Sequence, residues 1–266
     1  MEKDVALCEK SGFTVFELRF DMVKKYLDTH TFADLKVLFQ THSVRPVTIN
    51  AIFDINFANE DEWKRITEQF TFACQISEVT GARTVIIVPG TFDGTATREW
   101  QEIADDSAKA LTRLAHMGEP YGMKLAFEPI GAPNRYVRSI AEGWEVVQAV
   151  AREDVGIAAD LYNQYLYGNW EHELDALRCL PAEKIHIVHL NDVEALPFEQ
   201  LGTWNRTLPG DGIADCSAYL QAICLTGYDA VVSVETLSHR LWSIPPELLI
   251  PEAYQKTSRA LAASYT

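Results

Sequence analysis

The sequence has no closely spaced cysteines. Its five cysteines are odd in number, scattered along the chain and without a C-x-x-C pair: Cys8, Cys74, Cys179, Cys216 and Cys224. This spacing argues against a disulfide framework and against a zinc site built from thiolates. It fits a protein of the reducing cytoplasm, where disulfides are rare.

Positive charge and long apolar runs are also scarce. The 23 lysines and arginines face 38 aspartates and glutamates, which gives a formal net charge of −15. Nucleic acids and anionic membranes bind surfaces rich in basic side chains, so neither is expected as a partner. The longest apolar runs, such as residues 84–89, are far too short to span a bilayer. The 47 % of hydrophobic residues are nevertheless enough for a sizeable core.

Short apolar, β-branched segments recur along the 266 residues, and stretches with helical periodicity separate them. The strand-like segments cover residues 13–20, 45–53, 83–90, 123–131, 155–163, 185–192 and 229–237. Their starts are 30 to 44 residues apart, the length of one strand–helix unit, so the pattern predicts an α/β fold with a parallel sheet. Helices are expected over residues 60–80, 95–121, 140–152 and 246–264, and Ser139 with Glu142 forms a capping box for the third of them.

No linker or change in composition divides the chain, so residues 1–266 are expected to form a single domain. That domain is either a closed barrel or an open, doubly wound sheet. A dinucleotide site in an open sheet would need the pattern G-x-G-x-x-G directly after a strand. The glycine pair Gly210 and Gly212 lacks the third glycine and follows a long loop, so a simple turn before a helix at Asp215 is the better interpretation.

Polar side chains stand at the carboxyl ends of four consecutive strand-like segments: Glu128, Asp160, His189 and Glu235. In a parallel barrel these ends meet on one face, where the active site is built. Any one of the three acids alone would be interpreted as a helix N-cap or a solvated loop residue. Four such residues on consecutive strands favour a site for one divalent metal ion (Mn²⁺, Mg²⁺, Co²⁺ or Zn²⁺) with positions left open for a substrate.

Three neighbouring residues leave alternatives open. His186 falls on the opposite face of its strand from His189, which is typical of a buried structural histidine. Asp192 is either a partner that orients His189 or an ordinary loop residue. Arg206, within WNRTLPGDG, either holds a substrate oxygen or is one surface arginine among many.

Several motifs are shared with a known family over nearly the whole chain. They include LCEKSGF, EPYGMKLAFEPIG, HLNDVEALPFEQL, PGDGIAD and GYDAVVSVE. Together they resemble the xylose isomerase-like (β/α)₈ barrels, a type of TIM barrel. Within that family they resemble most the 2-keto-myo-inositol isomerases, also called inosose isomerases. The last three motifs are the more specific for this subgroup.

The resemblance implies that Glu128, Asp160, His189 and Glu235 hold a single divalent metal ion, and that the two glutamates transfer protons. The implied substrate is a polyhydroxy ketone, 2-keto-myo-inositol. One glutamate removes the proton beside the carbonyl, the metal and a nearby cation stabilise the enediolate, and a proton returns to the neighbouring carbon. A ketose 3-epimerase or a dehydratase would use the same groups. A sugar-binding protein without catalysis is a third alternative, against which the intact set of four ligands speaks.

Asn163 departs from the family pattern. Many relatives have a histidine three residues after the metal aspartate, and asparagine can hydrogen-bond a substrate hydroxyl but cannot carry a proton. The exact substrate is therefore left open. Endonuclease IV shares the HLND stretch, but its three-zinc site needs further histidines where this chain has Asn163 and, at 205–207, Asn-Arg-Thr. The missing ligands and the acidic charge argue against a nuclease.

The resemblance also implies a strand that this sequence does not supply. Relatives have a strand before the segment that matches LCEKSGF, whereas residues 3–10 here are typical of a helix. We therefore expect a barrel without its first strand, in which the first strand of this chain starts near Phe13. Either the natural start lies upstream, or the barrel has a gap with two unpaired edges. Such edges invite pairing with another chain, which would make a homo-oligomer.

Overall fold

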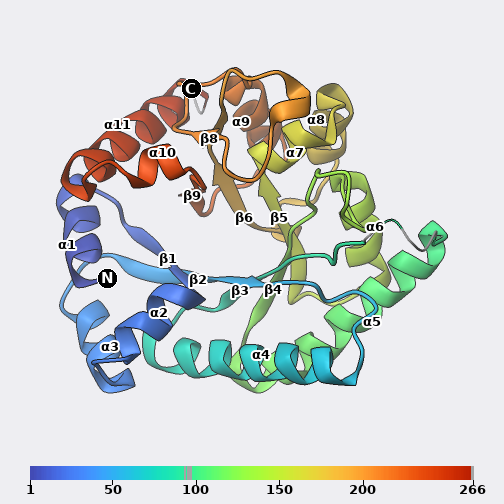
Figure 1. Cartoon of the computed structure of the whole chain (residues 1–266), viewed down its shortest axis with the longest axis horizontal. Coiled ribbons are helices and arrows are strands. Elements are labelled where there is room, and N and C mark those ends of the chain that lie inside the picture. Colours follow the sequence, from blue (N-terminus) through green and yellow to red (C-terminus); the bar gives the residue numbers. More distant parts are fainter. Residues whose placement is uncertain (93, 95–97, 265–266) are drawn as a thin grey trace.

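The structure is a computed structural model that describes residues 1–92, 94 and 98–264. Seven parallel strands form one curved sheet in the order β1-β2-β3-β4-β5-β6-β9, and helices surround it (Figure 1). The strands are Val15–Arg19 (β1), Arg45–Ile52 (β2), Thr84–Ile87 (β3), Lys124–Phe127 (β4), Val155–Asp160 (β5), Ile185–Leu190 (β6) and Val232–Val234 (β9). A small antiparallel pair, Asp192–Val193 (β7) and Arg206–Thr207 (β8), follows β6.

Long and short helices alternate with the strands. They are Glu2–Ser11 (α1), Phe20–Leu27 (α2), Phe32–Gln40 (α3), Glu60–Thr80 (α4), Trp100–Gly118 (α5), Ile140–Val150 (α6), Leu161–Tyr167 (α7), Trp170–Arg178 (α8), Cys216–Leu225 (α9), His239–Trp242 (α10) and Pro246–Ser264 (α11). Single 3-10 turns cover Glu119–Tyr121, Ala182–Lys184 and Phe198–Gln200. None of the described helices has an apolar stretch long enough to cross a membrane.

The expected alternation of strands and helices is confirmed, and the sheet curls into a nearly closed barrel (Figure 1). Each strand-like segment of the sequence contains one strand of this sheet. Helix α1 and the start of β1 at Val15 confirm the expected N-terminal helix and first strand. β1 and β9 are the two ends of the sheet, and among the described residues no strand is paired between them.

Helices α4 and α6 begin where the sequence predicts, and side chains cap their first turns. At α4, Asn59 accepts hydrogen bonds from the N–H of Glu62, and the Glu62 carboxylate accepts one from the N–H of Asn59. Ser139 and Glu142 make the same reciprocal pair at α6. Each pair satisfies backbone donors that the helix itself leaves free, and so specifies the first residue of the helix.

The ends of the predicted helices agree less closely than their starts. α4 and α11 have the predicted bounds, whereas α6 ends at Val150 because Ala151 adopts the left-handed conformation with φ 53°. α5 begins at Trp100, and the expected start at Thr95 lies outside the described residues. The expected turn before a helix at Asp215 is confirmed, since the Asp215 side chain caps α9.

The main hydrophobic core lies between the sheet and the helices. A second, small cluster of aliphatic side chains fills the interior of the barrel: Ala51, Ile86, Val88, Ala126, Ala158 and Ile187. Successive side chains of a strand point to opposite faces. The residues two positions beyond the last three of these therefore also face inward, and they are Glu128, Asp160 and His189. The alternation that packs the barrel thus delivers these polar side chains to its carboxyl end.

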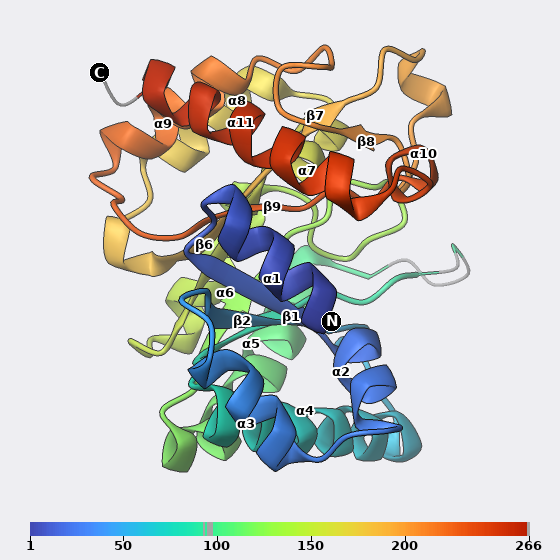
Figure 2. The same ribbon diagram turned by 90° about the vertical axis from the view of Figure 1, so that its left-hand side faces the viewer.

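The first and last helices lie side by side on the outside of the barrel, next to the side where β1 and β9 end the sheet (Figures 1 and 2). The rings of Phe13 and Tyr254 meet edge to face there, with centroids 5.2 Å apart. This contact packs the middle of α11 against the chain just before β1, so the N-terminal and C-terminal segments stabilise the same side of the molecule.

Candidate metal centre

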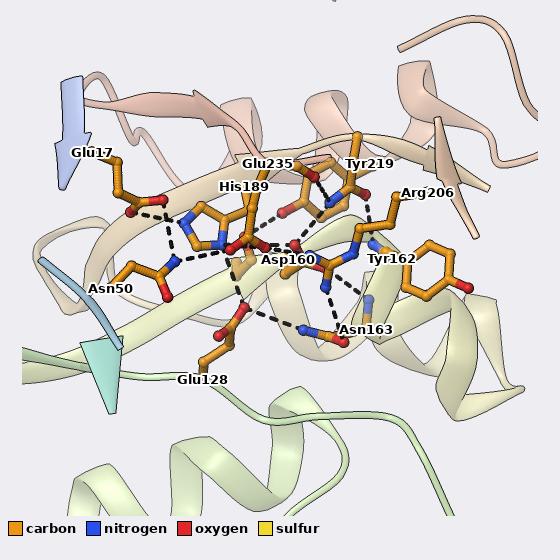
Figure 3. Close-up of polar contacts among 12 residues, drawn as sticks. Glu17, Asn50, Glu128, Asp160, Tyr162, Asn163, His189, Arg206, Tyr219 and Glu235 are labelled. Carbon is orange, nitrogen blue, oxygen red and sulfur yellow. Dashed lines mark hydrogen bonds and ion pairs between the residues drawn. The ribbon is translucent and has the colours of Figure 1, made fainter. Parts of the chain in front are cut away.

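Four side chains from four strand ends converge inside the carboxyl end of the barrel (Figure 3). Glu128 follows β4, Asp160 ends β5, His189 lies in β6 and Glu235 follows β9. Each offers one ligand atom, and these four atoms all lie within 4.8 Å of one another. The structure therefore brings together the four residues that the strand ends single out in the sequence.

The imidazole of His189 stands at the middle of this group and is fully buried. Its Nδ1 atom lies 3.4 Å from Glu128 Oε1, 3.7 Å from Asp160 Oδ2 and 3.7 Å from Glu235 Oε2. Glu128 and Asp160 are buried as well. One ring nitrogen thus faces three carboxylates across a space of the size that a single ion fills.

Burial and neighbouring charges shift the pKa values of Glu128 and Glu235 in opposite directions. Burial raises the pKa of Glu128 to about 7, although its contact with His189 opposes the rise. Burial would also raise the pKa of Glu235, but the positive charges of Arg206 and His189 outweigh it and lower that pKa to about 2. For His189 itself, burial lowers the pKa, yet the nearby carboxylates of Glu17 and Glu235 hold it well above its ordinary value.

Arg206 is buried beside the cluster and is not a surface arginine. It lies in β8, and its Nη1 forms an ion pair with Glu235 Oε2. Its Nη2 lies 3.5 Å from Asp160 Oδ1, and its guanidinium stands 5.1 Å from the centre of the Tyr162 ring. The small pair of strands β7 and β8 therefore places one permanent positive charge against two of the candidate ligands.

The side chain of Asn163 lies between Glu128 and Arg206 and contacts both. Asn163 lies in the first turn of α7, where its backbone N–H donates to Asp160 Oδ1 at 2.7 Å. Its side-chain amide donates to Glu128 Oε1 at 3.2 Å, and its Oδ1 lies 3.5 Å from Arg206 Nη2. Asp160 thus serves both as candidate ligand and as N-cap of α7, and the cap holds Asn163 against Glu128.

Asp192 has contacts other than His189 among the described residues. Its carboxylate accepts hydrogen bonds from the backbone N–H groups of Gly210, Gly212 and Ala214, at 2.9 to 3.0 Å, and from that of Val193. These bonds fold the PGDG loop back onto β7. The structure therefore shows Asp192 as the anchor of this loop.

Three residues at the site were missed by sequence reasoning. Asn191 donates to Asp160 Oδ2 at 2.8 Å and to the backbone oxygen of Glu235 at 3.1 Å. Glu17 lies 3.2 Å from His189 Nε2, and Asn50 donates to Glu235 Oε1 at 2.9 Å. The signal was present, since Asn191 is two residues after His189 and Glu17 and Asn50 lie near the carboxyl ends of β1 and β2.

A cavity of about 510 Å³ opens over the cluster. Glu128, Glu235, Arg206 and Asn163 line its polar floor, and the half-exposed ring of Phe198 lines its wall. This volume lies within the usual range of small-molecule sites, about 300–1,000 Å³. A small polar ligand in this cavity would touch both glutamates and the arginine.

The donor set fits a divalent ion. Three carboxylates and one imidazole suit Mg²⁺, Mn²⁺, Co²⁺ or Zn²⁺. The three acids, two of them buried and one partly exposed, repel one another, and a buried charge is costly unless it is paired. Arg206 sits at one edge of the group, so a cation at its centre would complete the pairing.

Comparison with known proteins agrees with this geometry. The model of the xylose isomerase-like TIM barrel family matches residues 5–261. The chain belongs to this family. Inosose isomerases of Bacillus velezensis and Bacillus subtilis strain 168 are each 31 % identical to it over 266 residues, all of this chain and 93 % and 94 % of theirs.

Solved structures superpose on all or nearly all of the chain. A 1.8 Å crystal structure of the IOLI protein with a binding zinc atom has a TM-score of 0.93 at 30 % identity, and covers 100 % of this chain and 94 % of that one. An L-ribulose 3-epimerase, 18 % identical, has a TM-score of 0.78 and covers 99 % and 89 % of the two chains. The latter likeness speaks for the shared barrel alone.

Proposed function

We propose that this xylose isomerase-like barrel isomerises 2-keto-myo-inositol, an inosose, with one divalent metal ion. The observation that carries the proposal is the convergence of four ligating side chains below a cavity. The full-length similarity to proteins named inosose isomerase supports the substrate. The reaction moves hydrogen between adjacent carbons of a polyhydroxy ketone, so it needs a base, an acid and stabilisation of negative charge, but no organic cofactor.

Glu128, Asp160, Glu235 and the Nδ1 atom of His189 would hold the ion, since these are the atoms that face one another. Bound there, Mn²⁺, Mg²⁺, Co²⁺ or Zn²⁺ would supply a Lewis acid for the carbonyl oxygen of the substrate. The burial of Glu128, Asp160 and His189 would keep bulk water from their ligand atoms.

Glu128 and Glu235 are the proposed proton-transferring pair. One carboxylate removes the proton from the hydroxyl-bearing carbon beside the carbonyl, the hydroxyl proton passes to the former carbonyl oxygen, and a proton returns to the former carbonyl carbon. In the metal-free site the two carboxyls differ, because burial raises the pKa of Glu128 to about 7, whereas at Glu235 the charge of Arg206 outweighs burial and lowers the pKa to about 2. A group whose pKa lies near neutral exchanges protons readily, while its partner stays ionised.

Arg206 and Asn163 are the proposed substrate-binding groups. Both line the cavity next to the glutamates. Arg206 stays protonated at any relevant pH, so it can stabilise an enediolate oxygen as negative charge develops. Asn163 offers an amide to a substrate hydroxyl while it holds Glu128 in place.

The proposal is tested by NMR of the metal-loaded protein with 2-keto-myo-inositol in D₂O. We expect a new keto-inositol in which the ketone has moved to the adjacent carbon. Glu128→Gln and Glu235→Gln keep the size of the side chain but remove the base, so both are expected to lose turnover with an unchanged circular dichroism spectrum. No exchange and no new ketone would overturn the proposal.

The same spectra separate the alternatives on this scaffold. A ketose 3-epimerase would invert a carbon centre without moving the ketone, and a dehydratase would release water and leave a less hydroxylated product. Either product in place of the isomer would replace the proposed reaction. Unchanged substrate that nevertheless binds would favour a sugar-binding protein.

We also infer a reducing compartment, the cytoplasm, for this chain. All five cysteines are free thiols. Burial raises the pKa of Cys8 and of Cys216 to about 12, so these thiols stay protonated and unreactive.

A further inference from the structure

The two ring nitrogens of His189 face different groups. Nδ1 faces the three candidate carboxylate ligands, as described above. Nε2 faces away from them and lies 3.2 Å from Oε2 of Glu17, a residue of β1 (Figure 3). A carboxylate accepts hydrogen bonds and does not donate them, so Nε2 carries a proton in this contact, and Nδ1 is the ring nitrogen that would bind an ion once its own proton is displaced.

Glu17 is also tied to a second member of the cluster. Its other oxygen, Oε1, accepts a hydrogen bond of 3.3 Å from the side-chain amide of Asn50 in β2. The same amide donates to Glu235 Oε1 at 2.9 Å. One carboxylate therefore touches His189 directly and reaches Glu235 through one asparagine.

These contacts cross the place where the barrel is not closed by backbone hydrogen bonds. β1 and β9 are the two ends of the sheet, and a cavity of about 280 Å³ lies between them, lined by Glu17, Asn50 and Glu235. Irregular strand pairing accompanies both Glu17 and Asn50. The register of β1 shifts between Phe16 and Glu17, and that of β2 shifts between residues 49 and 52, and such irregularities redirect side chains. The side chains thus connect elements that the backbone leaves unconnected.

We propose that Glu17 is a positioning residue for the metal centre. It holds the imidazole of His189 in the tautomer and orientation that direct Nδ1 to the ion, and through Asn50 it orients Glu235. The inference rests on the proposed metal site but adds to it a group on β1 that touches no ion. Groups that orient a metal-bound histidine commonly contribute about 10- to 100-fold in metal affinity.

Two variants of Glu17 test this role. Glu17→Gln keeps the shape but offers only one accepting oxygen, so it cannot serve His189 and Asn50 with separate oxygens. Glu17→Ala removes both contacts. We expect the zinc dissociation constant, measured by competition with a chromophoric chelator, to rise about 10- to 100-fold for Glu17→Ala and less for Glu17→Gln.

A second readout follows the histidine itself. In the zinc-loaded, ¹⁵N-labelled protein, the Nε2 proton of His189 is expected to give a slowly exchanging downfield signal because it is held by Glu17 and shielded from water. That signal is expected to broaden or vanish in Glu17→Ala. Glu173→Gln is the control, since Glu173 is a buried glutamate whose carboxylate contacts the backbone N–H of Ile140 and the ring of His172 and no member of the cluster. It is expected to lower thermal stability and to leave zinc affinity and the proton signal unchanged.

The outcomes separate this inference from the proposed metal site. Zinc affinities within threefold of the unaltered chain in both Glu17 variants, with the Nε2 proton signal retained, would overturn the role of Glu17 and leave the metal site standing. A loss of affinity equal to that of Glu173→Gln would also overturn it, because it would reflect stability alone. An unaltered chain that binds no zinc would overturn the metal site and the role of Glu17 together.

Discussion

Single residues of the centre owe their different properties to their neighbours rather than to their chemical type. Glu128 and Glu235 are the same side chain at the same barrel end, and both lie near His189 and a side-chain amide. Burial dominates at Glu128, whereas only Glu235 forms an ion pair with the buried guanidinium of Arg206. The pKa values of the two carboxyls therefore move apart. This asymmetry is what two-group proton transfer requires, and it depends on Arg206.

Metal affinity is expected to weaken as the pH falls below about 7. In the metal-free folded protein the pKa of Glu128 is raised to about 7, so below that pH the carboxyl carries a proton that the ion must displace. The raised pKa of His189 adds a second proton to displace. Each such proton lowers the affinity about tenfold per pH unit. Calorimetric titration with Mn²⁺ on both sides of neutral pH measures the slope, and a constant affinity would contradict it.

The four candidate ligands could be predicted because each stands at the end of a clear strand, but their supporting residues could be predicted only in part. Strand alternation puts Asn191 on the same face as His189 and Asp192 on the other, which is the arrangement that the contacts show. Glu17 and Asn50 are harder to predict, since the strands carrying them shift register. A side chain re-aimed by an irregular strand does not follow the period of two.

At the scale of elements, the β7–β8 pair and the loop that follows it determine how the carboxyl end of the barrel is built next to the metal centre. The loop between β8 and α9 folds onto β7 through Asp192, and β8 carries Arg206 into the site. The short helices α2, α3, α7, α8 and α10 and the β7–β8 pair were not predicted from the sequence. Elements this short have few residues to show a period, and their packing against the sheet stabilises them more than their own propensity does.

Asp192→Ala is expected to destabilise the fold without loss of metal affinity. The substitution leaves the N–H groups of Gly210, Gly212 and Ala214 without their acceptor, at a cost of about 1–3 kcal/mol in the free energy of unfolding. Urea denaturation measures this cost, with Asp229→Ala at an exposed aspartate as the control. A tenfold loss of metal affinity in Asp192→Ala would instead favour the other reading of the sequence, in which this residue orients His189.

Gly156→Ala is expected to destabilise the contact between β5 and β6. A Cβ atom built on Gly156 would stand 2.5 Å from the backbone oxygen of Lys184 and 2.7 Å from the ring of His186, which is fixed by its bond to the oxygen of Leu125. Because backbone must move, the expected cost is about 1–3 kcal/mol, seen as a lower Tm. Gly202→Ala is the control, since its nearest neighbour would be 3.9 Å away. Equal Tm values for the two variants would contradict this reading.

For the whole molecule, the acidic chain forms a nearly closed barrel whose two sheet ends meet through side chains at the metal centre. The alternation of strands and helices, the N-terminal helix and the bounds of α4 and α11 could be predicted, because apolar periods mark the helices and a capping box marks the start of α4. Strand order alone does not reveal that Glu17 and His189, 172 residues apart, come into contact. That contact arises when the sheet curls and brings β1 towards β6 and β9.

The most direct measurement of the central claim is the rate of 2-keto-myo-inositol conversion as a divalent ion is added back to chelator-treated protein. We expect almost no conversion without metal and a linear rise that ends at one equivalent of ion per chain, because one set of candidate ligand atoms lies within 4.8 Å among the described residues. Conversion that is undiminished after complete removal of metal, or that needs more than one ion per chain, would contradict it.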